Sequence, residues 1–109
     1  MPAIRHVDDI PGYPAPHSPY SHAVVANCFV FVSGQISVRP GGGPIEVVGD
    51  TMQEQTRQAL RDVQAILEGV GSALDRVVKV TGLLARPDLY RFGADIPGVL
   101  VAIEAIALV

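Results

Sequence analysis

The sequence predicts an α+β fold in which one amphipathic helix packs against a single β-sheet. The first observation is a helix-start pattern at Thr51 and Glu54, followed by apolar residues at helical spacing. The second is a set of short β-branched and aromatic runs on both sides of that helix. The third is size and composition, since 109 residues, of which 49% are hydrophobic and 17% charged, suffice for one core. We therefore expect residues 1–109 to form a single domain.

Composition also restricts the function classes. A net charge of −3 and a pI near 5.4 provide no broad basic surface, so nucleic acid is not an expected partner. The single cysteine, Cys28, cannot form an internal disulfide, and no Cys/His spacing predicts a zinc site. The longest apolar run, Val99–Val109, carries Glu104 and is too short to cross a bilayer. Together with the lack of a signal-peptide pattern, these features favour a cytoplasmic protein without a bound metal or a membrane partner.

The first half of the chain is predicted to contain three short strands. Five of the nine prolines lie in the first nineteen residues, so an extended loop should follow an edge strand at Ala3–Val7. The runs Ala23–Ala26 and Phe29–Ser33 are expected to form a hairpin around Asn27-Cys28. The glycines and prolines of Arg39–Pro44 predict a flexible surface loop, and these glycines lack the spacing of a phosphate-binding loop.

The helix is predicted to begin after Thr51, which forms a capping box with Glu54, and to stop at Gly69 and Gly71. Its apolar face comprises Ala59, Leu60, Val63, Ile66, Leu67 and Val70. Its other face is expected to be solvated and comprises Glu54, Arg57, Gln58, Arg61 and Asp62.

Two strands are predicted after the helix. Val77–Leu84 has the apolar composition of a buried strand, reached from the hairpin by a right-handed crossover through the helix. After Pro97-Gly98, the β-branched residues of Val99–Val109 favour a strand over a buried helix.

Two groups of reactive side chains have an ordinary structural interpretation. His6, His17 and His22 could supply a general base, but they lack paired ligand spacing and are more often surface residues in such loops. Cys28 has no neighbouring cation that would activate its thiol, so we expect a small side chain that is at least half-buried.

Four positions are candidate ligand contacts. Ser33 and Gly34 end a strand, where a glycine allows a ligand to approach the backbone; a simple bend is the alternative. Tyr20 precedes the hairpin and could donate its hydroxyl over the same sheet edge, or could be a core aromatic. Glu104 is the one charge in an apolar strand and could activate a water, or could face solvent at an edge.

Several motifs, in this order along the chain, resemble those of the RidA family of reactive-intermediate deaminases, also called YjgF-like proteins. They are Ser18-Pro19-Tyr20-Ser21-His22-Ala23-Val24, Val30-Phe31-Val32-Ser33-Gly34-Gln35-Ile36, Glu54-Gln55-Thr56-Arg57-Gln58-Ala59-Leu60 and Ile103-Glu104-Ala105-Ile106-Ala107. The resemblance implies a chorismate-mutase-like mixed β-sheet with helices on one face, a homotrimer and ligand clefts between subunits. It also implies hydrolysis of 2-imino acids to 2-keto acids and ammonia without a cofactor, with Tyr20, Ser33 and Gly34 contacting the substrate.

The chain departs from this family pattern at two functional positions. The family's Pro-x-Arg segment, which holds the substrate carboxylate, has no counterpart in Arg86–Pro97, and this interval is short by one helix and one strand relative to the family pattern. The family's first strand glutamate is Ala102 here, while Glu104 lies two residues further on the same strand face. We therefore expect deaminase activity that is weak or degenerate, with Glu104 as the catalytic candidate. The alternative is a non-catalytic trimeric module that binds a small carboxylate or a protein.

Overall fold

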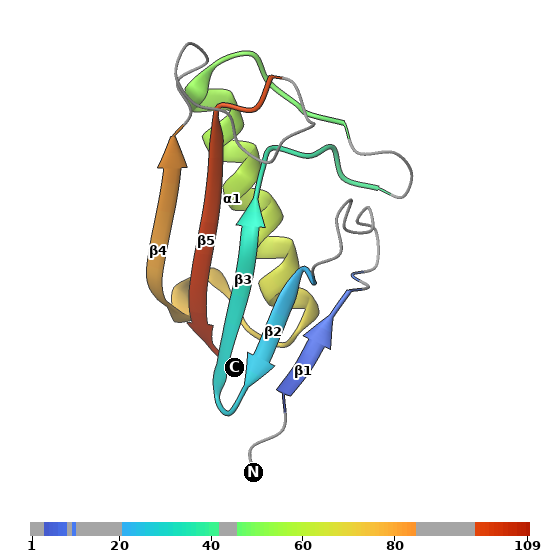
Figure 1. The fold of residues 1–109 in the computed structure, drawn as a ribbon, viewed down its shortest axis with the longest axis vertical. Helices are drawn as coiled ribbons and strands as arrows, with labels where there is room; N and C mark the ends of the chain where they lie inside the picture. The colour runs from blue at the N-terminus through green and yellow to red at the C-terminus, as the bar shows by residue number, and fades with distance from the viewer. Residues whose placement is uncertain (1–3, 9, 11–20, 42–45, 85–97) are drawn as a thin grey trace.

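The computed structural model describes residues 4–8, 10, 21–41, 46–84 and 98–109, and it has the predicted α+β architecture. Five strands form one sheet, and one long helix packs on one of its faces (Figure 1). The elements are β1 (Ile4–Val7), β2 (Ala23–Ala26), β3 (Phe29–Gln35), α1 (Met52–Gly69), the short 3-10 turn η1 (Leu74–Arg76), β4 (Val77–Leu84) and β5 (Val101–Leu108).

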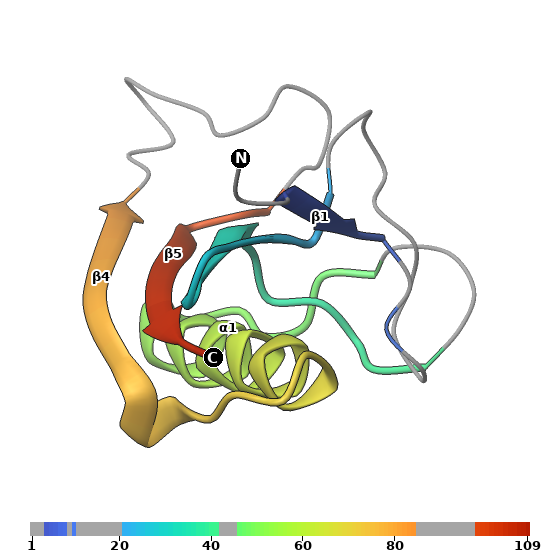
Figure 2. The ribbon, with the colours of Figure 1, turned by 90° about the horizontal axis from the view of Figure 1, so that it is seen from below.

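The sheet has the strand order β1-β2-β3-β5-β4. Each described neighbouring pair is antiparallel, in contrast to the mixed sheet that we expected. The last strand explains the difference, because β5 lies between β3 and β4, which run in the same direction. Figures 1 and 2 show α1 behind the sheet as the chain passes from β3 to β4, so the crossover is right-handed as predicted.

The helix begins and ends where the sequence predicted. Thr51 accepts a hydrogen bond from the Glu54 backbone N–H at 3.1 Å, and the Glu54 carboxylate accepts one from the Thr51 N–H at 3.2 Å. At the other end, Gly71 adopts a φ of +86°, a conformation that favours glycine. The predicted hairpin is also present, with Ala26 paired to Phe29 and Asn27 at a φ of +56°.

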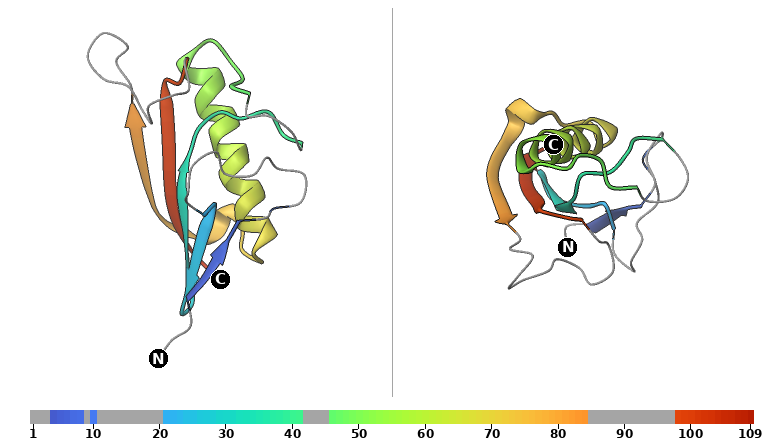
Figure 3. Two further views of the ribbon diagram at one scale, coloured as in Figure 1. Left: turned by 45° about the vertical axis from the view of Figure 1, so that its right-hand side comes forward. Right: turned by 90° about the horizontal axis from the view of Figure 1, so that it is seen from above.

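The core lies between α1 and the face of the sheet that α1 covers. The helix contributes Ala59, Val63, Ile66, Leu67 and Val70, and the two central strands contribute Val30, Val32, Val101, Ile103, Ala105 and Ala107. Along Phe29–Val32 and Ile103–Leu108 these residues alternate with exposed or half-buried ones, as a sheet covered on one face requires, whereas Ala102 on the other face is also buried. Figure 3 shows the same two layers from the side and from above.

Strand β4 is not the buried strand that we predicted. Val77 is half-buried, and Val78–Leu84 are exposed along their whole length. The physical reason is that β4 is an edge strand and α1 packs on β3 and β5, so the described chain leaves β4 uncovered beyond Val77. The apolar run Val77–Leu84 therefore predicted the strand correctly, but the prediction that this strand is buried was wrong.

Several polar side chains lie elsewhere than predicted. Asp62, expected on the solvated face of the helix, is fully buried, and its carboxylate accepts hydrogen bonds from the Val38 N–H at 2.8 Å and from Gln58 at 2.9 Å. His22 is buried, whereas Cys28 is exposed at the hairpin turn. Two interactions fix the start of the predicted flexible loop. The Val38 N–H donates to Asp62, and the Arg39 side chain forms an ion pair with Glu46.

Gln55 joins the start of the helix to the segment that enters β5. Its side chain is 1% exposed, donates to the carbonyls of Gly49 and Gly98 at 3.1 and 2.7 Å, and accepts from the Leu100 N–H at 2.9 Å. One amide group therefore satisfies three backbone groups from two separate segments.

We expect Gln55→Leu to lower the free energy of unfolding by about 1–3 kcal/mol, because it removes the hydrogen-bond partner of three backbone groups at a part-buried place. Urea unfolding monitored by circular dichroism measures the change. The control is Gln53→Leu on the exposed side of the same helical turn, where a change within about 0.5 kcal/mol is expected. Equal effects of the two substitutions would contradict the proposed anchoring role.

The capping box also predicts a pH dependence. Hydrogen bonds from the Thr51 side chain and from the backbone of Asp50 and Thr51 lower the pKa of Glu54 below its ordinary value of 4.5. A carboxyl whose pKa is lower in the folded state stabilises the fold above its unfolded pKa, and this contribution is lost as the pH falls through the folded pKa. Wild type should therefore lose stability more steeply than Glu54→Gln below pH 4.5, in unfolding curves recorded between pH 7 and pH 3. Parallel pH profiles would rule out a contribution from Glu54.

Candidate functional site

The candidate site lies on the face of the sheet opposite α1. On β5, Ile103, Ala105 and Ala107 face the helix, so Ala102, Glu104, Ile106 and Leu108 lie on the other face. The cross-strand register places Phe31 and Phe29 of β3 on the same face, opposite Ile106 and Leu108. We call this side of the sheet the open face.

A β-bulge brings two of the predicted residues opposite a third. Val32 pairs with Ala105 and Gln35 with Ile103, which leaves Ser33 and Gly34 of β3 against the single residue Glu104 of β5. A Cβ atom added to Gly34 would lie 3.8 Å from the Glu104 Cγ, so the two residues are in contact range. The structure therefore brings Ser33 and Gly34 together with Glu104, which lies 70 positions after Gly34 in the sequence.

The hydrogen bonds around Ser33 fix its hydroxyl. Its Oγ donates to the Ser21 carbonyl at 2.5 Å, and its backbone N–H donates to the His22 carbonyl at 3.0 Å. The Ser21 hydroxyl in turn lies 3.3 Å from the His6 Nδ1. Because its proton is already used, the Ser33 oxygen is available to a ligand mainly as an acceptor.

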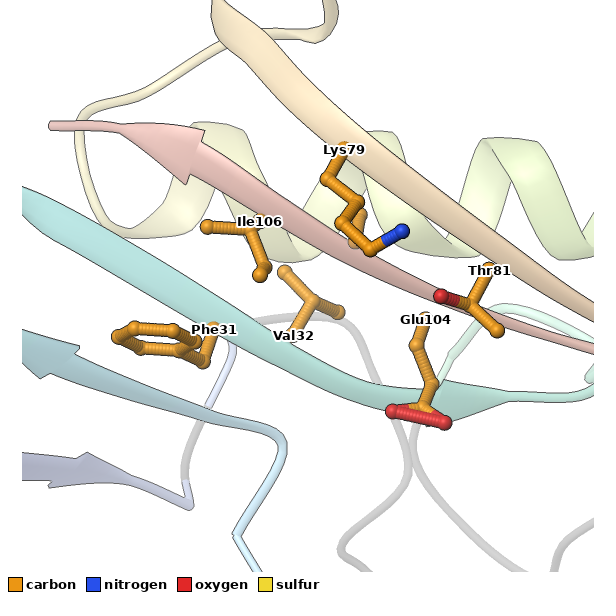
Figure 4. Close-up of a pocket in the computed structure, with 7 residues that line it drawn as sticks. Phe31, Val32, Lys79, Thr81, Glu104 and Ile106 are labelled. Carbon is orange, nitrogen blue, oxygen red and sulfur yellow. The ribbon is translucent and has the colours of Figure 1, made fainter.

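Glu104 is exposed and lies at the rim of a pocket of about 110 Å³. The pocket is formed by the central strands β3 and β5 and the edge strand β4, and its lining comprises Phe31, Val32, Lys79, Thr81, Glu104, Ala105 and Ile106. In Figure 4 the Lys79 ammonium group points toward Thr81, and the Glu104 side chain extends over β3. The pocket thus combines one anion, one cation and an apolar wall.

Lys79 and Thr81 were not among the predicted site residues. They are the polar side chains of the otherwise apolar strand β4, and the register places them opposite Ile106 and Glu104. The signal that singled out Glu104, one charge in an apolar strand, would also have selected Lys79.

The remaining sequence expectations have different outcomes. Tyr20 and His17 lie outside the described residues. Ala102, in the place of the family's first glutamate, is 7% exposed on the open face. In the described part of the chain, no group of three His, Cys, Asp or Glu side chains could hold a metal ion. Nor is any described helix long and apolar enough to cross a membrane.

Comparison with known proteins identifies relatives of this fold and sequence. The endoribonuclease L-PSP family model matches residues 12–94. A RutC family protein from Pyrococcus horikoshii is 46% identical over 68 residues, which are 62% of this chain and 52% of that protein. The 2-iminobutanoate/2-iminopropanoate deaminase of Mus musculus is 37% identical over 90 residues, which are 83% of this chain and 64% of the enzyme.

A solved structure agrees with these sequence matches. The crystal structure of Escherichia coli TdcF with bound serine superposes with a TM-score of 0.74 at 25% identity, covering 96% of this chain and 99% of that one. The chain therefore has the fold of these proteins, and its sequence matches span about half to two-thirds of the length of the curated relatives.

Proposed function

The chain belongs to the endoribonuclease L-PSP family, and on this basis we propose that it hydrolyses reactive 2-imino acids such as 2-iminobutanoate and 2-iminopropanoate. Similarity to the deaminases of mouse and human, at 37% identity each, supports this substrate class. The observation that carries the proposal is the position of Glu104 against the Ser33-Gly34 bulge, at the rim of a pocket sized for a small acid.

The proposed reaction consumes one water and requires no cofactor. Glu104 accepts a proton from a water whose oxygen attacks the imine carbon, and it passes this proton to the imine nitrogen, which gives a carbinolamine. The hydroxyl proton of the carbinolamine then moves to the nitrogen as the C–N bond breaks. The carbonyl carbon retains the oxygen, and the nitrogen leaves as ammonia. Gly34 allows the substrate to approach the strand, Ser33 offers an acceptor, and Tyr20 remains a proposed substrate contact from the sequence.

We expect this activity to be weak compared with that of complete family members. Ala102 has no carboxylate, and Glu104 lies about 7 Å further along the strand. The arginine segment that the family uses to hold the substrate carboxylate has no match in this chain. Loss of a positioned acid or base typically costs about 10²–10⁴ in rate, and loss of a charge contact about 10²–10³.

We also propose a cytoplasmic homotrimer with its clefts between subunits. The open face exposes Ile4, Phe29, Phe31, Leu83 and Leu108, and β4 exposes Val78, Val80 and Leu84 as well. Apolar surface on this scale is typical of an interface, so a second copy that packs on these apolar residues, and leaves the pocket at Glu104 as a cleft between subunits, would stabilise the protein.

The oligomer prediction is a mass of three 11.5 kDa chains at micromolar concentration, measured by light scattering after size exclusion. Phe31→Glu should shift the population toward monomer, because it places a charge in the apolar part of the open face. Glu68→Lys on α1, which is exposed away from the sheet, is the control and should leave the mass unchanged. A wild-type monomer would exclude both the trimer and a shared cleft.

The catalytic prediction uses two substitutions on one strand face. Glu104→Gln should reduce keto-acid release by about 10²-fold or more, because glutamine cannot accept the proton from water. Ala102→Glu should raise the rate, because it restores a carboxylate at the family position. The assay couples a dehydratase to keto-acid detection and subtracts spontaneous hydrolysis, with Glu68→Gln as the control. Full activity in Glu104→Gln would refute the role of Glu104.

The second candidate function is a non-catalytic module that binds a small carboxylate or a protein partner at the same cleft. Ala102, in place of the family's first glutamate, favours this function. Binding of 2-oxobutanoate by wild type, without catalysed release of keto acid by wild type or Ala102→Glu, would support it over the deaminase.

A further inference from the structure

Two opposite charges share the pocket on the open face. Lys79 of β4 and Glu104 of β5 both line it, with Thr81 between them and with Phe31 and Ile106 as its apolar wall (Figure 4). Its volume of about 110 Å³ exceeds the roughly 10–15 Å³ that one water requires. It is also well below the ~300–1,000 Å³ of sites for drug-sized ligands. The space therefore suits a molecule of a few heavy atoms.

A second β-bulge places Lys79 on this face. Val77 pairs with Ala107, but Lys79 pairs with Ile106 and Thr81 with Glu104, so one extra residue of β4 lies between these pairs. Without the bulge, Lys79 would pair with Ala105, whose side chain faces the helix. The bulge thus turns both polar groups of β4 toward Glu104.

The two charges do not neutralise each other. Arg39 and Glu46 form the ion pair of the described chain, and no such contact joins Lys79 to Glu104. Both side chains are exposed, on neighbouring strands and two residues out of register. A ligand can therefore contact the ammonium group with one end and the carboxylate with the other.

We propose that this pocket recognises small dipolar acids, with the ligand carboxylate on Lys79 and its nitrogen on Glu104. The ammonium group offers three donors to a carboxylate, and the Glu104 oxygens accept from the N–H groups of an amine or an iminium. The reverse orientation would place two carboxylates together, so electrostatics selects one pose. A short side chain would then lie against Phe31 and Ile106.

This inference rests on the proposed function, because both place Glu104 at the ligand. It adds Lys79 as the residue that binds the ligand carboxylate. A lysine acts as a point charge on a flexible stem, whereas an arginine holds a carboxylate with two parallel hydrogen bonds. We therefore expect the pocket to bind its ligand weakly and to orient it less strictly than an arginine would.

Ligand binding at Lys79 can be observed by NMR without overlap from other lysines, because Lys79 is the only lysine in the sequence. Reductive methylation with ¹³C-formaldehyde retains its charge and yields one lysine methyl resonance, distinct from that of the N-terminal amine. Titration of the intact protein with three four-carbon compounds then separates the two ends of the pocket. Butanoate carries only the anion, butylamine only the cation, and 2-aminobutanoate both.

Each substitution should weaken the binding of only those ligands that carry the opposite charge to the side chain removed. Lys79→Gln should weaken butanoate and 2-aminobutanoate about tenfold and leave butylamine unchanged, whereas Glu104→Gln should weaken butylamine and 2-aminobutanoate. Affinities of the unmethylated variants are measured from amide shifts. Lys79→Arg should retain anion binding, which separates the role of charge from an effect on folding. Arg61→Gln, which removes an exposed cation on α1, is the matched control and should change none of them.

The outcomes separate this inference from the proposed function. Equal butanoate affinity in wild type and Lys79→Gln, or no binding of any compound to wild type, overturns the dipolar pocket. The expected pattern of weakened binding without catalysed keto-acid release supports the pocket and refutes the deaminase. Keto-acid release with kcat and KM unchanged in Lys79→Gln supports the deaminase and refutes the pocket.

Discussion

One constraint organises the described part of this protein: helix α1 covers the central strands on one face of a five-stranded sheet. Because α1 packs on β3 and β5, the residues of these strands that face the helix must be apolar, and those on the other face are free to be polar. Ile103 and Ala105 face the helix, and Glu104 lies between them on the open face. A register slip of one residue would bury that carboxylate, so the core itself determines which side carries the site.

Buried polar side chains on the helix hold the ends of the central strands. Asp62 binds the backbone just after β3, and Gln55 binds the segment just before β5. Both side chains are buried and provide partners for backbone groups of these segments, and both lie on the same helix. The helix therefore does more than fill the core, because it also fixes where the two strands that flank the bulge leave and enter the sheet.

The sequence predicted elements with a local signal and failed where burial depends on a distant segment. The Thr51–Glu54 box, the Asn27 turn and the β-branched residues of β5 are local patterns, and each lies in the element that was expected. The position of Asp62 in the helical pattern is the same whether water or the segment after β3 lies beside it. The sequence pattern therefore could not predict that Asp62 is buried. The apolar run of β4 likewise did not reveal that β5 pairs beside it and leaves it at the edge.

The same distinction explains the site. Glu104 could be selected as a lone charge in an apolar strand, but its neighbours depend on two bulges, one in β3 and one in β4, on either side of β5. The first puts Ser33 and Gly34 against Glu104, and the second turns Lys79 to the same face. Each bulge adds one residue to a strand and has no reliable sequence signature here, since both runs keep a continuous apolar pattern up to the bulge. Because β5 pairs with both bulged strands, Gly34 of β3 and Lys79 of β4 lie on the same face of the sheet as Glu104 of β5. The strand register therefore determines which chemical groups the pocket contains.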